Sequence, residues 1–259
     1  MNSRSIPVRL FATVTFLAVL VVSAAAPALA AWISTGGADG APVGVRLLEA
    51  SAGRGVIEYT VPGFDASPVT IDGRTYQAIS LPGESNLLQA GLPELPHVAR
   101  SIIIPFAARM RARVLGMETT EFPGMRVIPS KGNLLRTVDP ATVPYSFSPF
   151  YGTTAEFPES RVQTGEPYIL RDYRGLVVDA FPITVTGEGT IRVATRMTIE
   201  VVVDGVDGTN ALDRSGPPES VVREFNEVYQ SRFLNYGGGR YTPVIERGKM
   251  LIITYDAFH

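Results

Sequence analysis

The stretch Thr190–Val203, with the sequence TIRVATRMTIEVVV, is the strongest β-strand signal in the chain. Its apolar side chains recur at every second residue, and a strand places such residues on one face. A strand of this length is long enough to cross a whole sheet. One face of the predicted strand carries Ile191, Val193, Met197, Ile199, Val201 and Val203.

Shorter strand signals lie on both sides of this stretch. Asp72-Gly73 predicts a hairpin within 69–76, because both residues tolerate the positive φ angles of a type I′ turn. Arg109–Leu115 alternates three arginines with Met110, Ala112 and Val114, so we expect the arginines to face solvent. The 25 glycines and 20 prolines are scattered, as in a chain cut into short strands. The other predicted strands are Val56–Val61, Ile102–Ile104 and Phe181–Thr186, the last followed by a turn at 187–189. The fold class is therefore mainly β, an antiparallel β-sandwich or jelly-roll-like domain.

The C-terminal part has a different pattern. Apolar residues at helical spacing from Val221 to Phe233 predict one helix that begins at Pro217-Pro218. Gly237–Gly239 then forms an exposed linker of the kind that proteases cut. The continuous apolar run Met250–Thr254 is typical of a strand buried on both faces of an α/β sheet. We therefore expect a second, truncated α/β domain to begin after the linker.

The N-terminus has the features of an export signal. Arg4 and Arg9 precede the apolar stretch Leu10–Val22, which is too short for a membrane span. Ala28-Leu29-Ala30 fits a small-residue cleavage site, so we expect residues 1–30 to be removed, with cleavage after Ala30 or Ala31. The mature chain is then secreted or extracytoplasmic, in the secreted pool or on the cell surface, with no membrane contact after signal removal.

The composition excludes several kinds of site. There is no cysteine, and the two histidines are His97 and His259, so a metal site or a cysteine nucleophile within the chain is not expected. We expect no cofactor, and His97 should lie on a loop or strand edge with one hydrogen bond. Asp204–Gly208 lacks the ligand spacing of a calcium loop and predicts a turn. The net charge of −2 gives no positive field for nucleic acid.

Several segments together resemble the propeptide of gingipain-type cysteine peptidases. They are Val45–Ala50, Gly91–Pro96, Ile128–Gly132, Pro167–Gly175, Phe233–Tyr236, Arg240–Val244 and Met250–Thr254. The resemblance implies a propeptide domain over 31–240 that helps the cognate peptidase domain to fold and keeps it latent in cis. It also implies that 241–259 is the truncated start of a caspase-like peptidase domain, whose catalytic Cys and His lie beyond residue 259. This segment is then not an enzyme, whereas the full-length precursor is a cysteine-type endopeptidase.

Two kinds of functional arginine follow from this resemblance. An inhibitor of an arginine-specific peptidase should present an arginine on an exposed loop, since a guanidinium pairs with a carboxylate in two-pronged geometry. Arg161 is the inhibitory-loop candidate, with Arg126 and Arg136 as rivals. Arg240-Tyr241 is the candidate processing site because it follows the glycine run, with Arg247 as a second-step alternative. The alternative function is an exported β-sandwich binding or adhesion module without a linked peptidase.

Overall fold

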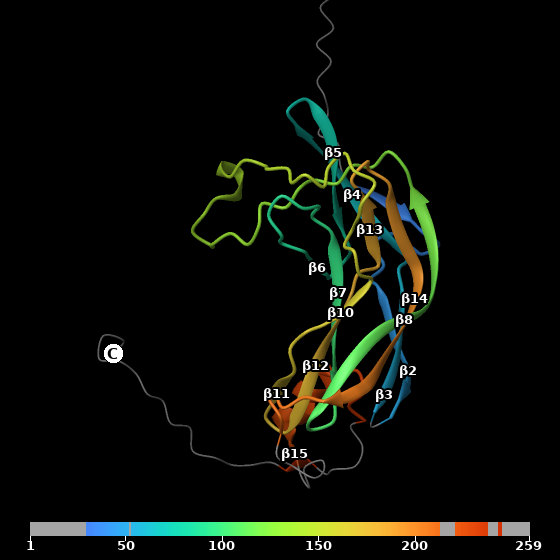
Figure 1. Cartoon of the computed structure of the whole chain (residues 1–259), viewed down its shortest axis with the longest axis vertical. Coiled ribbons are helices and arrows are strands. Elements are labelled where there is room, and N and C mark those ends of the chain that lie inside the picture. The colour runs from blue at the N-terminus through green and yellow to red at the C-terminus, as the bar shows by residue number, and fades with distance from the viewer. Residues whose placement is uncertain (1–29, 52, 213–220, 238–242, 245–259) are drawn as a thin grey trace, which may run out of the picture.

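The fold is organised around one long strand. The computed structural model describes residues 30–51, 53–212, 221–237 and 243–244. The long strand, β14, pairs antiparallel with β8 along one edge and with β13 and β3 in turn along the other. This confirms the strand predicted at Thr190–Val203 (Figure 1). The six-stranded sheet around it contains β2 (Gly44–Ala50), β3 (Arg54–Thr60), β8 (Ala108–Phe122), β9 (Glu156–Phe157), β13 (Ile183–Thr186) and β14 (Ile191–Val206).

The predicted apolar face of β14 is buried except at its end. Ile191, Val193, Met197, Ile199 and Val201 have no exposed surface, whereas Val203 is 38% exposed. Val203 is more exposed because β3 ends its pairing at Val202, so the neighbouring strand no longer covers the next residue. The register with β8 also shifts between Ala194 and Arg196, which marks a bulge.

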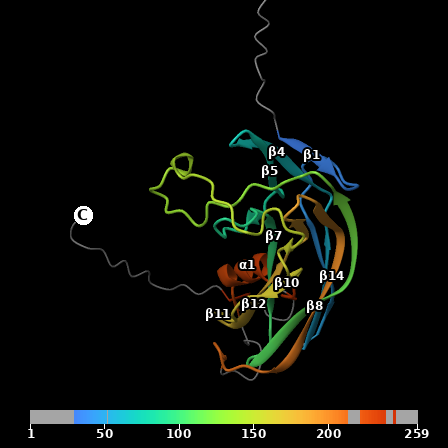
Figure 2. The same cartoon turned by 45° about the horizontal axis from the view of Figure 1, so that its top comes forward.

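A second antiparallel sheet packs its inner face against the first. Side chains of both sheets share one core, to which β7 contributes Val98 and Ile102 and β12 contributes Leu176 and Val178. The predicted run Ile102–Ile104 is the end of the longer strand β7. Two antiparallel sheets around a common core give a sandwich (Figures 1 and 2). The five strands of this sheet are β6 (Ser85–Asn86), β7 (Pro96–Ile103), β10 (Val162–Thr164), β11 (Tyr168–Leu170) and β12 (Tyr173–Ala180).

A small three-stranded sheet lies at the N-terminal end of the described chain. Its central hairpin turns at Asp72 (φ 48°) and Gly73 (φ 74°), which confirms the predicted positive-φ turn. The other partner of β4 is β1, which begins at Ala31. The three strands are β1 (Ala31–Ser34), β4 (Gly63–Ile71) and β5 (Arg74–Ser80).

One α-helix follows the sheets, as predicted, but it starts later than predicted. It is α1 (Arg223–Arg232), and it follows the short strand β15 (Val221–Val222). Val221 and Val222 are β-branched and buried, and they pair in parallel with β16 (Pro243–Val244). The helix therefore cannot include Val221, and the predicted start at Pro217-Pro218 falls outside the described residues.

His97 lies within a strand rather than on a loop. It belongs to β7, which has β12 on one edge and β6 on the other. Its Nδ1 lies 2.5 Å from Asp179 Oδ1 on β12, and its Nε2 lies 3.2 Å from Ser85 Oγ on β6. His97 therefore forms two side-chain hydrogen bonds, whereas one was expected from sequence. The hydrogen bond to Asp179 raises the pKa of His97, although burial opposes the shift and Glu84 adds to it.

We predict a pH-dependent stabilisation by His97. Because its pKa in the folded chain lies above the unfolded value of about 6.5, the contribution is complete below that pH. It is lost as the pH rises through the folded-state pKa. His97→Gln should lower the free energy of unfolding more at pH 5.5 than at pH 9, measured by urea denaturation. Asp179→Asn should show the same pH dependence, and an equal loss at both pH values in either variant would contradict the assignment.

Candidate functional site

A long loop projects from the body of the sandwich. Residues 131–150 follow the segment 123–130, which continues from the end of β8, and they project from that end of the molecule (Figures 1 and 2). The loop contains the short 3-10 helix η1 (Pro140–Thr142), which Asp139 caps by accepting from the Ala141 amide at 2.9 Å. Lys131 Nζ donates to the Pro140 carbonyl at 2.7 Å and lies 4.3 Å from the Tyr145 ring centre. These cross-links hold the loop in one shape although most of it faces solvent.

The outer part of this loop carries an exposed arginine. The Val138 amide donates to the Leu135 carbonyl at 2.9 Å, which closes a turn with Arg136 and Thr137 at its centre. Leu135 is 75% exposed, and Arg136 is also exposed. Within the described ranges, no side-chain hydrogen bond or ion pair engages Arg136. The turn therefore presents an exposed arginine that has no side-chain partner among the described residues.

The base of the loop is fixed by two of the segments that carry the family resemblance. Gly91–Pro96 runs beside Ile128–Gly132, with bridges at Ala90–Ser130 and Pro93–Pro129. The Ser130 amide donates to the Leu92 carbonyl, and the Gly91 amide donates to the Ser130 carbonyl. Through these main-chain bonds, each of the two segments fixes the position of the other at the point where the loop leaves the body.

Arg161, the inhibitory candidate from sequence, has a different environment. Its side chain is 16% exposed and forms an ion pair with Glu156 at 2.8 Å. Burial lowers the pKa of Arg161, and the charge of Glu156 offsets part of this effect. The exposed loop expected around residue 161 is replaced by the strands β9 and β10 on either side of it. Presenting this guanidinium to a partner requires breaking the pair with Glu156.

The C-terminal segment is fastened to β7 by an asparagine side chain. Asn235 Oδ1 accepts from the Ile103 amide at 2.7 Å, and its Nδ2 donates to the Ile103 carbonyl at 2.8 Å. The Leu234 amide donates to the Ser101 carbonyl at 2.9 Å. The Asn235 side chain thus satisfies the main-chain groups of Ile103 as a neighbouring strand would. No sequence pattern had indicated this role. The position of Asn235 in Phe233–Tyr236 was the available signal.

An aromatic cluster packs α1 onto β11 and β12. Tyr173 lies edge-on to Tyr229 with ring centres 4.9 Å apart, and Tyr229 Oη donates to Asp172 at 2.7 Å. Gly175 makes this packing possible, because a Cβ there would lie 2.6 Å from the Tyr168 ring and 2.8 Å from Phe233. The helix therefore has a fixed position on the sheet.

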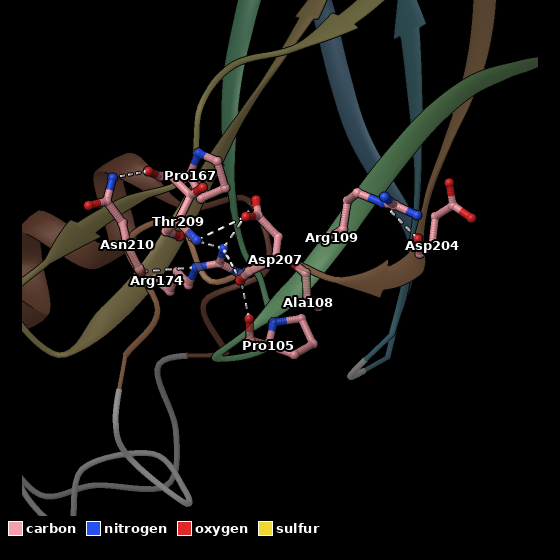
Figure 3. A network of polar contacts seen from close by, with 9 residues as sticks. All are labelled: Pro105, Ala108, Arg109, Pro167, Arg174, Asp204, Asp207, Thr209 and Asn210. Atoms are coloured by element: carbon pink, nitrogen blue, oxygen red, sulfur yellow. Dashed lines mark hydrogen bonds and ion pairs between the residues drawn. The ribbon is translucent and has the colours of Figure 1, made fainter.

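Arg174 on β12 binds the turn between β7 and β8 and the segment that follows β14 (Figure 3). Its guanidinium has no exposed side-chain surface and donates five hydrogen bonds to main-chain carbonyls, each between 2.8 and 3.3 Å. The Asp207 carboxylate lies 3.8 Å away. All five N–H donors of the side chain are used, and these hydrogen bonds offset the desolvation penalty of burying the charge. The accepting carbonyls belong to Pro105, Ala108, Asp207, Thr209 and Asn210.

Comparison with known proteins identifies the family. Residues 36–241 match the family described as Propeptide_C25. The chain belongs to the gingipain propeptide family. Gingipain R1 of Porphyromonas gingivalis is 33% identical over 171 residues, which cover 65% of this chain and 17% of that protein. Gingipain R2 of the same organism is 29% identical over 212 residues, which cover 81% of this chain and 28% of that protein. This gingipain propeptide therefore spans under a third of the curated relatives it matches.

Solved gingipain propeptides have the same fold. A structure described as the complex of Porphyromonas gingivalis RgpB pro- and mature domains aligns with a TM-score of 0.66 and 26% identity, covering 74% of this chain and 97% of that chain. A structure described in terms of zymogenic latency of gingipain K aligns with a TM-score of 0.56 at 19% identity, a likeness of fold alone. The resemblance predicted from sequence and the mainly β architecture with one C-terminal helix are both confirmed.

Several predicted positions cannot be placed in this fold. Arg240, Tyr241, Arg247 and the run Met250–Thr254 lie outside the described residues, as does most of the predicted export signal. At the predicted signal cleavage site, Ala30 precedes the first strand, and Ala31 pairs with Ala66 within it. In the described part of the chain, no cluster of ligating side chains could hold a metal ion, and no helix is long and apolar enough to cross a membrane.

We predict that the stability of this gingipain propeptide depends on Arg174. Arg174→Met keeps much of the side-chain volume but leaves five buried carbonyls without their donor. The free energy of unfolding should fall by about 3–5 kcal/mol, the usual cost of breaking a buried charge network. Urea denaturation measures the loss, and Arg46→Met, in an exposed ion pair with Glu58, should cost less than about 1 kcal/mol. Equal losses in the two variants would show that the five bonds contribute nothing.

Proposed function

We propose that this chain is the N-terminal propeptide of a secreted gingipain-type cysteine endopeptidase. It acts as intramolecular chaperone and inhibitor of the peptidase domain that follows it, and it is then removed by proteolysis. Family membership supports this proposal, together with the likeness to a propeptide that was solved in complex with its mature domain. The observation that carries it is the braced projecting loop, whose outer turn holds Arg136 without a side-chain partner in the described part of the chain.

Arg136 is the side chain that we expect to enter the peptidase cleft. A peptidase that selects arginine offers a carboxylate in its specificity pocket, and the guanidinium forms paired hydrogen bonds with such a group. The cross-links through Lys131 and Asp139 restrict the loop before binding, so less conformational entropy is lost on docking. Arg161 stays a candidate, but its pair with Glu156 must first be exchanged for one with the peptidase.

The termini follow from the same proposal. Residues 1–30 serve as the export signal, and cleavage after Ala30 leaves β1 intact from Ala31, which places the mature chain outside the cytoplasm. Arg240-Tyr241 is the processing site, in the span between the anchored Asn235 and β16. Residues 241–259 begin a caspase-like α/β domain, with Met250–Thr254 as its first strand.

Inhibition by substituted propeptides tests the role of Arg136. The chain from Ala31 onward is titrated against the separately prepared peptidase domain of its precursor. Arg136→Ala should weaken inhibition by about 100-fold or more, since a desolvated charge pair loses one partner, and Arg136→Lys should lose less because it keeps the charge. The inhibition constant is the measured quantity.

Arg161→Ala is the matched comparison for this test. It should lower the stability of the propeptide while leaving the inhibition constant within about threefold, because its pair with Glu156 is internal. A large loss with Arg161→Ala and none with Arg136→Ala would move the inhibitory contact to residue 161. No inhibition by the unsubstituted chain would favour an exported binding or adhesion module instead.

The processing site can be tested in the full precursor. Arg240→Gln should prevent cleavage between residues 240 and 241 while Arg247→Gln leaves it unchanged, because an arginine-specific cut requires the arginine itself. N-terminal sequencing of the released peptidase should give Tyr241 as its first residue in the unsubstituted protein. A first residue at Gly248 in that protein would assign the cut to Arg247.

A further inference from the structure

Two more arginines without an internal partner line one pocket beside the base of the projecting loop. The pocket measures about 330 Å³, and its walls include Arg74 on β5 and Arg126 after β8. Among the described residues, neither arginine forms a side-chain hydrogen bond or ion pair. Glu188 also lines the pocket and forms no ion pair with any residue that the structure describes, so the pocket carries two positive charges and one negative charge.

The main chain fixes the position of Arg126. Its carbonyl accepts from the Gln77 amide at 2.7 Å, and the neighbouring Met125 amide donates to the Gly189 carbonyl at 2.8 Å. Gly189 has φ +98°, and a Cβ there would lie 2.7 Å from Arg126 Cγ. The stem of Arg126 therefore lies across this glycine, which restricts the direction of the guanidinium.

The opposite wall is equally well fixed. The Gly152 amide donates to the Gly187 carbonyl at 2.8 Å, and the Gly187 amide donates to the Ala155 carbonyl at 3.1 Å. A Cβ at Gly187 would lie 2.0 Å from the Phe150 carbonyl oxygen, so only glycine permits this approach. The pocket is thus built from four chain segments that main-chain bonds hold together before any ligand binds.

The same walls support the projecting loop. Tyr76 and Tyr151 line the pocket, and both rings also contact Phe147 on the returning part of the loop, with ring centres 5.2 and 4.9 Å apart. A protein surface that receives the loop therefore comes close to the pocket. Tyr151 Oη donates to the Val127 carbonyl at 3.2 Å, so the two guanidinium groups are the main donors for an incoming group.

We propose that this pocket receives the carboxylate of an Asp or Glu side chain from the rim of the peptidase cleft, as a second contact beside Arg136. The inference rests on the proposed function. Two arginines match the paired acceptor oxygens of a carboxylate, and their excess positive charge attracts it. The contact fixes the orientation of the propeptide on its partner, whereas Arg136 occupies the specificity pocket.

The test compares charge-neutralised propeptides as inhibitors. The chain from Ala31 to His259 is prepared in three forms: unsubstituted, with both Arg74→Gln and Arg126→Gln, and with Arg196→Gln as the control. Arg196 is exposed, has no ion pair among the described residues and lies outside this pocket. The double variant should weaken inhibition of the separately prepared peptidase domain at least about tenfold at low salt, and the control less than about twofold. The difference should shrink at about 1 M salt, where exposed charges are screened.

The outcomes separate the two proposals. A double variant that inhibits within twofold of the Arg196→Gln control at low salt overturns the pocket contact, while loss of inhibition with Arg136→Ala in the same assay keeps the proposed function. No inhibition by the unsubstituted chain overturns both. Thermal unfolding verifies that the double variant is folded. If it is not folded, the single variant Arg74→Gln decides, because Arg74 is exposed at the hairpin end and its substitution should not disturb the fold. This single variant should still weaken inhibition about threefold.

Discussion

The hydrogen bonding of β14 along both of its edges is the constraint on which the other features depend. Because β8 occupies one edge throughout, while β13 and β3 share the other, β14 fixes the relative positions of four chain segments. Its apolar face forms one side of the core that β7 and β12 complete. The end of β8 lies beside the start of β14, so the chain enters the projecting loop next to the β13–β14 turn. The β8–β14 pairing therefore brings the chain to the projecting loop, whose base and neighbouring pocket are held by further main-chain bonds.

Two sets of arginines in this propeptide differ in where their charge is satisfied. Arg174 and Arg161 are met by carbonyls or a carboxylate of the same chain, so they stabilise the fold. Arg136, Arg74 and Arg126 have exposed guanidinium groups that no described side chain engages, and all three lie on or beside the projecting loop. A buried guanidinium without partners is too costly to persist, but an exposed one costs little in the free chain. The second group can therefore be reserved for a partner without destabilising the propeptide.

Much of the sheet architecture could be predicted from sequence, because period-two patterns report directly which face of a strand is buried. The hairpin at Asp72-Gly73 was also predictable, because these two residues tolerate the positive φ angles of its turn. Contacts between distant segments could not be predicted from sequence. Val203 is partly exposed because β3 ends before it, and Val221 pairs with β16 instead of joining the helix. Arg161 and Arg136 look alike in sequence, since both lie between turn-forming residues. What distinguishes them is the ion pair with Glu156 for Arg161, and for Arg136 a closed, exposed turn in which no described side chain pairs with it.

The pairing of β15 with β16 has a consequence for what happens after processing. Asn235 is bound to β7 and Pro243 is paired with Val221, so the proposed cut at Arg240 falls between two points attached to the same body. Hydrolysis there breaks covalent continuity but leaves the main-chain bonds of the two short strands in place. The severed halves of the precursor would thus remain a nicked, non-covalent assembly. Under the proposed processing, release of the peptidase domain would then depend on the rate of dissociation as well as on peptide-bond cleavage.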